Sequence, residues 1–474
     1  MGLAVDTEIE NRTFAEIEVG DSANVVRTLG EDDIALFAVV SGDVNPALLD
    51  AAHATNDPLH RIVGHGMWAG ALISAVLGTK LPGAGTIYLS QNLHFHAAVR
   101  IGDTVTATIV AREKKPETQR IIFDCRCVNQ DGREVVSGSA EVEAPSQKVR
   151  RPRAELPDVR LNRHRRFREL LARTRGQPAL PLAVAHPCDA ASLGAVGDLA
   201  AAGLVVPILV GPAAKIHAAA DAAGLNVSSF RLVDVPHSHA AAARAVALIR
   251  AGEAELLMKG SLHTDELMHE VVAHETGLRT ERRLSHAYIM DVPSYPRPLL
   301  LTDAAVNIAP TLEEKRDIVR NAIDLARVMG IETPRVAILS AVETVNPSIR
   351  STLDAAALCK MTDRGQITGG LVDGPLAFDN AVSPEAARQK GIVSPVAGRA
   401  DILVVPDLEA GNMLAKQLTF LAGADAAGVV LGARVPIILT SRADSVRTRV
   451  ASGAVAVLMA RARHATTTLV RDAS

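Results

Sequence analysis

The chain has 474 residues, which is more than one hydrophobic core normally holds, so several domains are expected. Charged residues make up 22% of the chain and nearly cancel, giving a formal net charge of −3. No overall field would therefore attract nucleic acid or an anionic membrane, and an anionic ligand has to be bound by a local site. Aromatic residues are only 3%, which argues against stacking platforms for bases.

Cysteine usage and hydropathy favour the reducing cytoplasm. Four cysteines are too few and too scattered for a disulfide framework, and the spacing of Cys125 and Cys127 does not suit a zinc site. No run of about 20 apolar residues could span a bilayer. The first residues, MGLAVDTEIENRTF, lack the apolar core of a signal peptide. We therefore expect a soluble cytoplasmic protein without a metal and without a membrane partner.

Residues 1–147 combine one apolar helix with several strands. GMWAGALISAVLG (66–78) predicts a helix that is apolar on every side. The alternating segments DTVTATIVARE, QRIIFDCRCVN and REVVSGSAEVE predict strands, with a hairpin turn at Asp131-Gly132. Because such a helix has to be buried, we expect an α+β domain in which an antiparallel sheet wraps around a central helix.

Residues 148–178 form a strongly basic segment that includes KVRRPRAELPDVRLNRHRRFREL. Two interpretations fit such a run of charge: a nucleic-acid-binding tract, or a solvated linker lying on the acidic surface of a neighbouring domain. No aromatic residues are interleaved to stack on bases, so the composition favours the linker.

Residues 179–474 show the rhythm of an α/β domain. Short apolar runs such as LAVAHP, VVPILVG, PLLLTDAAV and DILVVPD alternate with helical segments. The length predicts two lobes with a cleft between them, and ligands of such sheets bind outside the carboxyl ends of the strands. A dinucleotide-dependent dehydrogenase would show the same rhythm, but SLGAVGDLAAAG lacks the glycine spacing of a dinucleotide site.

One strand-to-helix turn, in PIILTSRADSVRTRVASGAVAVLMA, is a candidate phosphate site. The pattern predicts that the strand ends at Leu439 and that a long helix follows at once, with Ser441, Arg442 and Asp444 in its first turn. The N–H groups of a helix start attract anions, and a guanidinium matches two phosphate oxygens. The spacing of Ser441 and Asp444 also fits a simple capping box, and the spacing alone leaves both interpretations open.

Several motifs in order resemble one enzyme family. MKGSLHTDELM, RRLSHAYIMDV, LLLTDAAVNIAP, DGPLAFDNAV, VVPDLEAGNML and LTSRADS resemble the phosphate acetyl/butyryltransferases over residues 180–474. The resemblance implies a two-lobed α/β subunit of the isocitrate-dehydrogenase-like type, usually dimeric. It also implies that acyl-CoA and phosphate meet in the cleft and react reversibly to acyl phosphate and CoA, with these substrates and no further cofactor.

The same resemblance implies residue roles. Ser441 would donate to the reacting acyl group and Arg442 would clamp the phosphoryl oxygens. The acetyl branch has an Asp six residues after this pair and a Cys in the LTDAAVN motif, where this chain has Thr448 and Ala304; Asp444 is then the candidate base for the CoA thiol, and an acyl chain longer than acetyl is plausible. Further candidate substrate-binding residues, of which Asp407 is equally suited to cap a helix, are Lys259, Gly260, Arg279, Asp303, Asn307, Asp407, Gly411 and Asn412.

Residues 30–143 resemble a second family. FAVVSGDVNP, IVGHGMWAGALISAVLGTKLPGAGTIYLSQNLHF and VRIGDTVTA are similar to the MaoC-like, hot-dog-fold hydratases of (R)-3-hydroxyacyl-CoA and 2-enoyl-CoA. Asp43 would be the catalytic base. Backbone N–H groups near Gly64 and Gly66 would hold the enolate oxygen. The family's partner His, five residues after the Asp, is Leu48 here.

This replacement predicts that the pocket still binds acyl-CoA while hydration is weak or absent. Asn45 and His65 complete the candidate substrate site, although Asp43 and Asn45 are also ordinary turn residues and His65 could simply cap the helix. The leading hypothesis is a fused acyl-CoA enzyme with two activities. The alternative is a phosphate acyltransferase whose N-terminal domain only binds acyl-CoA or assembles the oligomer. Both family resemblances imply a homo-oligomer formed through both domains.

Overall fold

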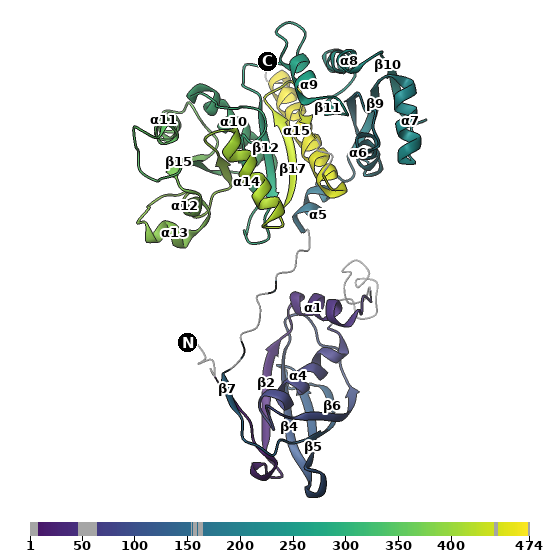
Figure 1. The fold of residues 1–474 in the computed structure, drawn as a ribbon, viewed down its shortest axis with the longest axis vertical. Coiled ribbons are helices and arrows are strands. Elements are labelled where there is room, and N and C mark those ends of the chain that lie inside the picture. Colours follow the sequence, from purple (N-terminus) through teal and green to yellow (C-terminus); the bar gives the residue numbers. More distant parts are fainter. Residues whose placement is uncertain are drawn as a thin grey trace. The chain divides into compact units, whose positions relative to one another are not determined.

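The computed structural model describes residues 8–45, 64–152, 154, 159, 165–439 and 444–472. It separates into two compact units, Met1–Leu161 and Asn162–Ser474, which we describe one at a time (Figure 1). Within the described residues, no helix is long and apolar enough to cross a membrane.

Unit 1 is built on a five-stranded antiparallel sheet with the order β2-β4-β5-β6-β3. Every second side chain is buried from Thr104 to Ala111 of β4 and along the whole of β5, and these buried side chains form one core with the helix α4. The bounds are β1 Glu8–Glu10, β2 Ser22–Thr28, α1 Glu31–Ser41, α4 Gly66–Thr79, β3 Ile87–Phe95, β4 Thr104–Lys115, β5 Arg120–Val128, β6 Glu134–Glu143 and β7 Arg150–Pro152.

The predicted central helix is present, but its burial is one-sided. Trp68, Ile73 and Val76 face the sheet, whereas Met67 on the other side is 55% exposed. The expectation of burial on every side is therefore wrong for the single chain, because five strands cover only one face of a helix. The hairpin at Asp131-Gly132 is confirmed: it joins β5 to β6, with Gly132 at φ +76°.

Two parts of the basic segment belong to the folded units. β7 pairs antiparallel with β1, so Pro152 lies opposite Glu8 and the two ends of unit 1 are joined. The helix α5, Arg165–Ala172, packs against α15 in unit 2. Both stretches lie inside the range expected to be linker. They are ordered because β7 pairs with β1 and because Phe167 and Leu170 of α5 pack into the core of unit 2.

Unit 2 is an α/β domain with one continuous sheet. Its elements are β8 Leu180–Ala185, α6 Ala190–Ala201, β9 Val205–Gly211, α7 Ala213–Ala223, β10 Arg231–Asp234, α8 Ser238–Arg250, β11 Leu256–Lys259, α9 Thr264–Val272, β12 Ser285–Asp291, β13 Leu299–Thr302, α10 Leu312–Val328, β14 Arg335–Leu339, α11 Arg350–Asp363, β15 Leu371–Leu376, α12 Phe378–Val382, α13 Pro384–Gln389, β16 Ile402–Val404, α14 Leu408–Phe420, β17 Asp425–Leu431, β18 Ile437–Ile438 and α15 Val446–Asp472.

The strand order is β10-β9-β8-β11-β18-β17-β12-β13-β16-β14-β15. The strands from β10 to β18 are parallel to one another and make the first lobe; those from β13 to β15 are likewise parallel and make the second. Between the lobes, β17 and β12 pair antiparallel with each other and with their outer neighbours. The two predicted lobes are thus halves of one sheet, joined at β12 and β17.

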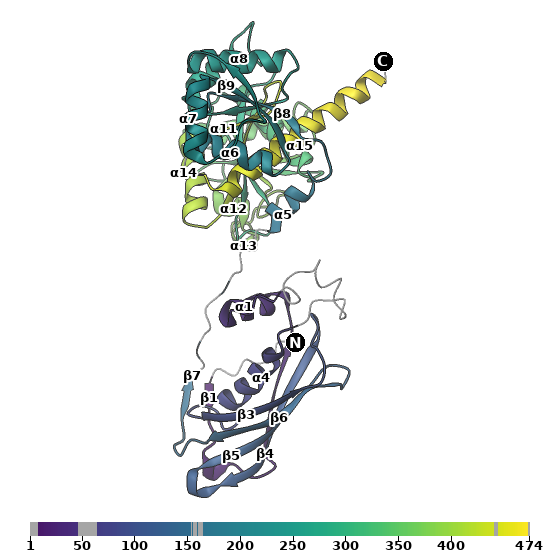
Figure 2. The ribbon, with the colours of Figure 1, turned by 90° about the vertical axis from the view of Figure 1, so that its right-hand side faces the viewer.

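The cores of unit 2 show where the lobes separate. On one face, a single core extends across both lobes and includes α6, α10 and α15. On the other face, one core packs under α8 and α9 and a second under α12 to α14. These two cores meet at β12 and β17, so the middle strands carry the boundary. Figure 2 shows α15 crossing unit 2 and extending past it.

Candidate functional site

The end of β13 forms a tightly bonded turn. The carboxylate of Asp303 accepts the N–H groups of Ala305 and Val306 at 3.0 Å and the side-chain amide of Asn307 at 2.5 Å. The Asn307 amide also donates to Leu284 O at 2.8 Å, and its oxygen accepts from Nε of Arg283 at 2.8 Å. Asp303 and Asn307 are both buried. The bonds fix the turn rigidly at the carboxyl end of a central strand.

The start of α14 packs against this turn. A Cβ on Gly411 would lie 2.9 Å from Asp303 O and 3.0 Å from Ala304 Cα, so only glycine permits this approach. Asn412 donates to Ala304 O at 3.3 Å, and Asp407 caps α14 by accepting from Ala410 N at 2.9 Å. The structure therefore brings Asp303, Asn307, Gly411 and Asn412 together, with Asp407 in the capping position.

Two side chains of β12 that sequence reasoning did not single out lie beside the turn. Thr302 donates to His286 O at 2.8 Å, and the rings of His286 and Tyr288 meet edge-on, 4.4 Å apart. Burial lowers the pKa of His286 to about 4, against an opposing effect of the Asp303 charge. A Cβ on Gly428 would lie 2.9 Å from Nε2 of His286, so the opposite strand leaves room for the ring.

Tyr288 links Asp444 to the Asp303 turn. Burial raises the pKa of Tyr288, and the charges of Asp444 and Asp303 raise it further. Tyr288 therefore lies within the electric fields of both carboxylates. The only sequence signal for this group was a histidine and a tyrosine two residues apart in the apolar strand of RRLSHAYIMDV, on the same face of the sheet.

The predicted phosphate turn is described only in part, because Ser441 and Arg442 lie outside the described residues. The expectation that the helix follows Leu439 directly is wrong, since α15 begins at Val446. Ser445 takes the capping position and accepts from Thr448 N at 3.1 Å. Asp444 precedes the helix, and its backbone oxygen accepts from Arg449 at 2.7 Å.

The first lobe carries the other predicted residues at the carboxyl end of β11. Lys259 donates to Leu262 O at 3.1 Å, within its own loop. A Cβ on Gly260 would lie 2.5 Å from the carbonyl oxygens of Ala185 and His186, so this glycine lets the loop reach the end of β8. Arg279 forms an isolated bridge with Ala433. These contacts place the three residues in the first lobe, whereas the Asp303 turn begins the second.

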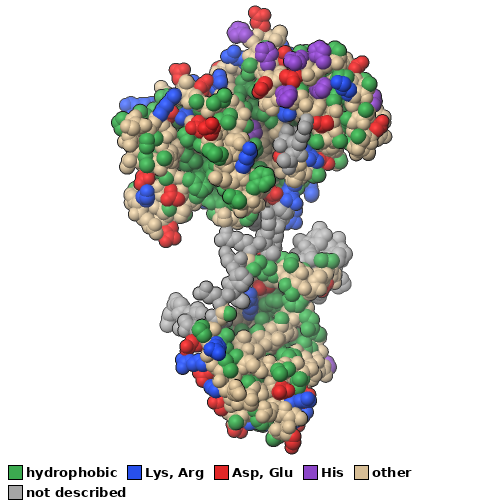
Figure 3. Space-filling view, in the orientation of Figure 1, with side chains coloured by type: hydrophobic (Ala, Val, Ile, Leu, Met, Phe, Trp, Pro, Cys, Tyr) green, Lys and Arg blue, Asp and Glu red, His purple; other side chains and the backbone are tan. Residues whose placement is uncertain are grey.

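Histidines surround this part of the first lobe, over α8 and α9 (Figure 3). His263 precedes α9, and His239 lies 3.4 Å from the carboxylate of Glu266. A hydrogen bond from Ser238 lowers the pKa of Glu266, and the charges of His239 and His263 lower it further.

In unit 1, the chain brings Asp43 and His65 together. Nε2 of His65 lies 3.2 Å from the backbone oxygen of Asp43 and 3.7 Å from its carboxylate. The His65 side chain is only 2% exposed and packs on the ring of Phe37. Asn45 N donates to the Asp43 carboxylate at 3.3 Å, which is the turn geometry foreseen for these residues. Leu48 lies outside the described residues, as do His53 and His60.

A cavity of about 360 Å³ opens beside the start of α4. His65, Gly66 and Phe95 line it, together with His96, whose Nε2 is 2.6 Å from the hydroxyl of Ser137. Gly64 N donates to Val99 O at 2.8 Å, so that N–H is already used. Of the two backbone donors expected to hold an oxygen, at Gly64 and Gly66, the one at Gly64 therefore already has a partner.

Comparisons with known proteins place both units. A family model described as phosphate acetyl/butaryl transferase matches residues 237–457, and one described as MaoC like domain matches residues 12–127. A phosphate acetyltransferase of Rhizobium meliloti is 66% identical over 300 residues, which are 63% of this chain and 95% of that protein. The chain belongs to the phosphate acetyl/butyryltransferase family. Unit 2 is its phosphate acyltransferase domain, and unit 1 is a MaoC hydratase-like domain.

Two solved structures are also similar. A branched-chain phosphotransacylase from Enterococcus faecalis V583 is 31% identical, covering 59% of this chain and 99% of that chain with a TM-score of 0.53. An R-hydratase from Pseudomonas aeruginosa is 43% identical, covering 33% of this chain and 99% of that chain with a TM-score of 0.32. Among the described residues, no group of His, Cys, Asp and Glu is arranged to hold a metal ion.

Proposed function

We propose that unit 2 transfers an acyl group between CoA and inorganic phosphate through the turn that contains Ser441 and Arg442. Family membership supports the reaction. Its location is supported by the hydrogen bond of 2.9 Å from Gly428 N of β17 to the hydroxyl of Ser452, which holds the start of α15, just after this turn, on a middle strand of the sheet. The site then lies at the boundary between the lobes, as ligand sites in α/β sheets commonly do.

The proposed chemistry needs positioning and one proton transfer. Towards acyl-CoA, Asp444 takes the proton of the CoA thiol, the sulfur attacks the carbonyl carbon of the acyl phosphate, and the carbon–oxygen bond to phosphate breaks. Arg442 holds the departing phosphate oxygens and Ser441 donates to the carbonyl oxygen. Such a clamp acts by stabilising charge in the transition state. The reverse direction uses the same groups.

Arg442→Ala should reduce acyl phosphate formation from acetyl-CoA and phosphate by about 10²- to 10³-fold, because the clamp is lost. Arg442→Lys keeps the charge but not the planar guanidinium, so its rate should lie between those of the wild type and Arg442→Ala. Release of CoA thiol measures the rate, and circular dichroism checks the fold. Wild-type rates in Arg442→Ala would rule the site out.

We also propose acetyl-CoA as the preferred substrate. The chain is 66% identical to a phosphate acetyltransferase and 31% identical to a branched-chain phosphotransacylase. The higher identity supports acetyl-CoA over a branched acyl-CoA. Thr448 and Ala304 argue for a longer chain, so the two indications differ. Comparison of kcat/KM for acetyl-, butyryl- and isobutyryl-CoA decides between them, and a higher value for butyryl-CoA would reverse the proposal.

For unit 1, we propose that the cavity binds an acyl-CoA thioester and hydrates it weakly. Asp43 and His65 supply one base and one imidazole, but the imidazole of the family motif is replaced by Leu48. Leu48→His should raise hydration of crotonyl-CoA by about 10²-fold or more, because it restores a positioned partner. Asp43→Asn is the control and should remove the gain. Robust wild-type hydration that Leu48→His leaves unchanged would contradict the proposal.

We further propose that the edge strand β3 joins a second copy of the chain. β3 ends the sheet of unit 1, and its Ile87 and Phe95 are 55% and 52% exposed, as is Met67 of α4 at 55%. An unprotected apolar edge of this kind normally pairs. Ile87→Lys with Phe95→Lys should lower the mass found by sedimentation. Val26→Lys, on the opposite edge strand and 58% exposed, should not. An unchanged mass in the double variant would refute the interface.

A further inference from the structure

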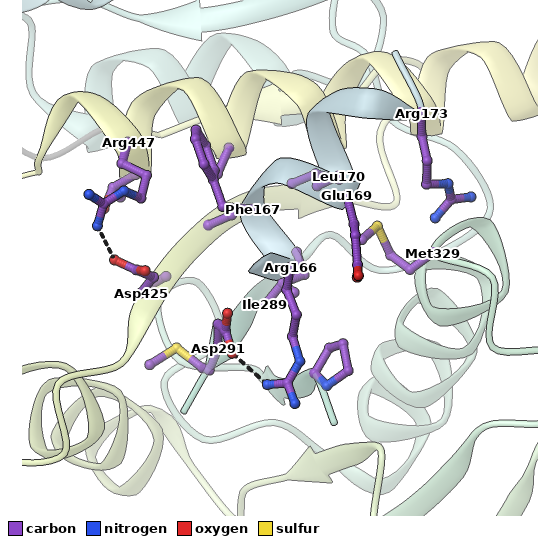
Figure 4. A pocket seen from close by; sticks show the side chains of 16 residues that line it. Arg166, Phe167, Glu169, Leu170, Arg173, Ile289, Asp291, Met329, Asp425 and Arg447 are labelled. Atoms are coloured by element: carbon purple, nitrogen blue, oxygen red, sulfur yellow. Dashed lines mark hydrogen bonds and ion pairs between the residues drawn. The ribbon is translucent and has the colours of Figure 1, made fainter. Parts of the chain in front are cut away.

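Unit 2 has a cavity beside α5 (Figure 4). It measures about 160 Å³ and lies between α5, the ends of β12 and β17, and the first two turns of α15. Ile289 lines it and shares a face of β12 with Ala287. Because side chains alternate along a strand, His286 and Tyr288 point to the opposite face. Most of the cavity therefore lies on the face of β12 opposite His286 and Tyr288.

The interior of this cavity is apolar. Its walls include Phe167 and Leu170 of α5, Ile289 of β12, Ala427 of β17 and Ala451 of α15. A concave, mostly apolar space with a few polar groups at its rim has the form of a small-molecule site. A cavity of about 150 Å³ with similar walls binds benzene, which points to a chain of about six carbons.

The charged groups at the rim differ in their pairing. Arg166 is bonded to Asp291, and Arg447 lies 3.1 Å from Asp425, so both guanidiniums are neutralised. Arg173 donates to Val328 O at 2.6 Å and has no carboxylate partner among the described residues. It is an exposed guanidinium with donors suited to an anionic head group.

Glu169, the remaining acid at the rim, is one helical turn before Arg173. The carboxylate of Glu169 would weaken the attraction of Arg173 for an anion, but the N–H donors of Arg173 would remain. The rim therefore has one cation available for a carboxylate and an apolar space for its chain.

One wall connects the cavity to the proposed reaction. Arg447, Thr448 and Ala451 belong to the start of α15, which directly follows Asp444. Arg449 holds Asp444 O at 2.7 Å and is itself fixed by Asp198. A ligand that packs on this helix start thus contacts the element that positions the phosphate turn.

We propose that this cavity binds a short aliphatic carboxylate of about six carbons, and that its binding changes the affinity for phosphate through α15. The binding part stands by itself, whereas the coupling part rests on the proposed transferase function. By linkage, a ligand that stabilises one position of the helix start changes phosphate binding, and phosphate changes ligand binding equally.

Calorimetric titration of the full chain with butyrate, hexanoate, octanoate and hexanol tests the binding. Hexanoate should bind most tightly of the acids. Arg173→Ala should weaken hexanoate about tenfold or more but leave hexanol unchanged, because only the carboxylate contact is lost. Ala451→Leu should abolish both by filling the space, while Arg175→Ala, an exposed arginine nearby, should change neither. The site would be overturned if hexanoate showed no saturable binding to the wild type. It would also be overturned if Arg173→Ala and Ala451→Leu both bound hexanoate with wild-type affinity.

The coupling is tested by the KM for phosphate with and without saturating hexanoate. We expect a change of about fivefold or more in the wild type and none in Ala451→Leu. An unchanged KM while hexanoate is bound would overturn the coupling and leave the binding site. An inactive enzyme without hexanoate would instead count against the proposed function, since the titration does not depend on catalysis.

Discussion

Burial of His286 decides its charge. Its pKa is about 4 in the folded protein, because burial disfavours the imidazolium more than Asp303 favours it, and about 6.5 in the unfolded chain. The unfolded state therefore binds more protons between these values. The contribution of neutral His286 to the free energy of unfolding is therefore complete above pH 6.5 and is lost as the pH falls towards 4.

This sign gives a prediction for unfolding in urea. Between pH 7.5 and pH 5, His286 should lower the free energy of unfolding of unit 2 by about 2 kcal/mol. His286→Gln should remove that part of the pH dependence, although the variant is less stable at neutral pH. His269→Gln, at an exposed position of α9, is the control and should keep the full dependence. Equal pH dependence in all three proteins would show that His286 is not buried neutral.

At the scale of elements, two helical glycines have opposite environments. Gly411 allows α14 to touch the Asp303 turn, and a Cβ there would also lie 2.8 Å from Cγ2 of Val405. Gly194 of α6 has nothing within 4 Å of a Cβ. The same substitution should therefore act in opposite directions in the two helices.

Gly411→Ala should lower the free energy of unfolding by about 1–3 kcal/mol through overpacking, and should lower kcat/KM by moving the turn. Gly194→Ala should raise stability by up to about 1 kcal/mol because alanine favours helix, with kinetics unchanged. Urea unfolding and CoA-thiol release measure both variants. Wild-type stability and kinetics in Gly411→Ala would mean that α14 does not press on the Asp303 turn.

At the scale of the molecule, unit 2 has a sheet and hydrophobic cores of its own. Its sheet pairs only strands of residues 180–438, and its three cores draw only on its own residues. A fragment of residues 162–474 should therefore unfold cooperatively and keep kcat/KM for acetyl-CoA within about twofold of the full chain. Purified fragment and full chain can be compared side by side. A fragment that folds but is inactive would show that unit 1 takes part in the transfer reaction.

The sequence alone determined the features that depend on local periodicity. The apolar run at 66–78 and the alternating strands predicted the helix and sheet of unit 1, and the spaced apolar runs after residue 179 predicted the α/β domain. These features follow from side-chain direction within one element. The family resemblance added Asp303, Asn307, Gly411 and Asn412, which the fold places together.

Only the tertiary structure decided which distant side chains meet. Asp43 lies beside His65 because Ile34 and Phe37 of α1 pack into the same core as α4. His286 and Tyr288 lie beside the Asp303 turn because β12 pairs antiparallel with β13. The one-sided burial of α4 and the cavity under α5 likewise depend on how many elements cover a face. Strand order and packing join parts far apart in the chain, and residue periodicity carries no information about them.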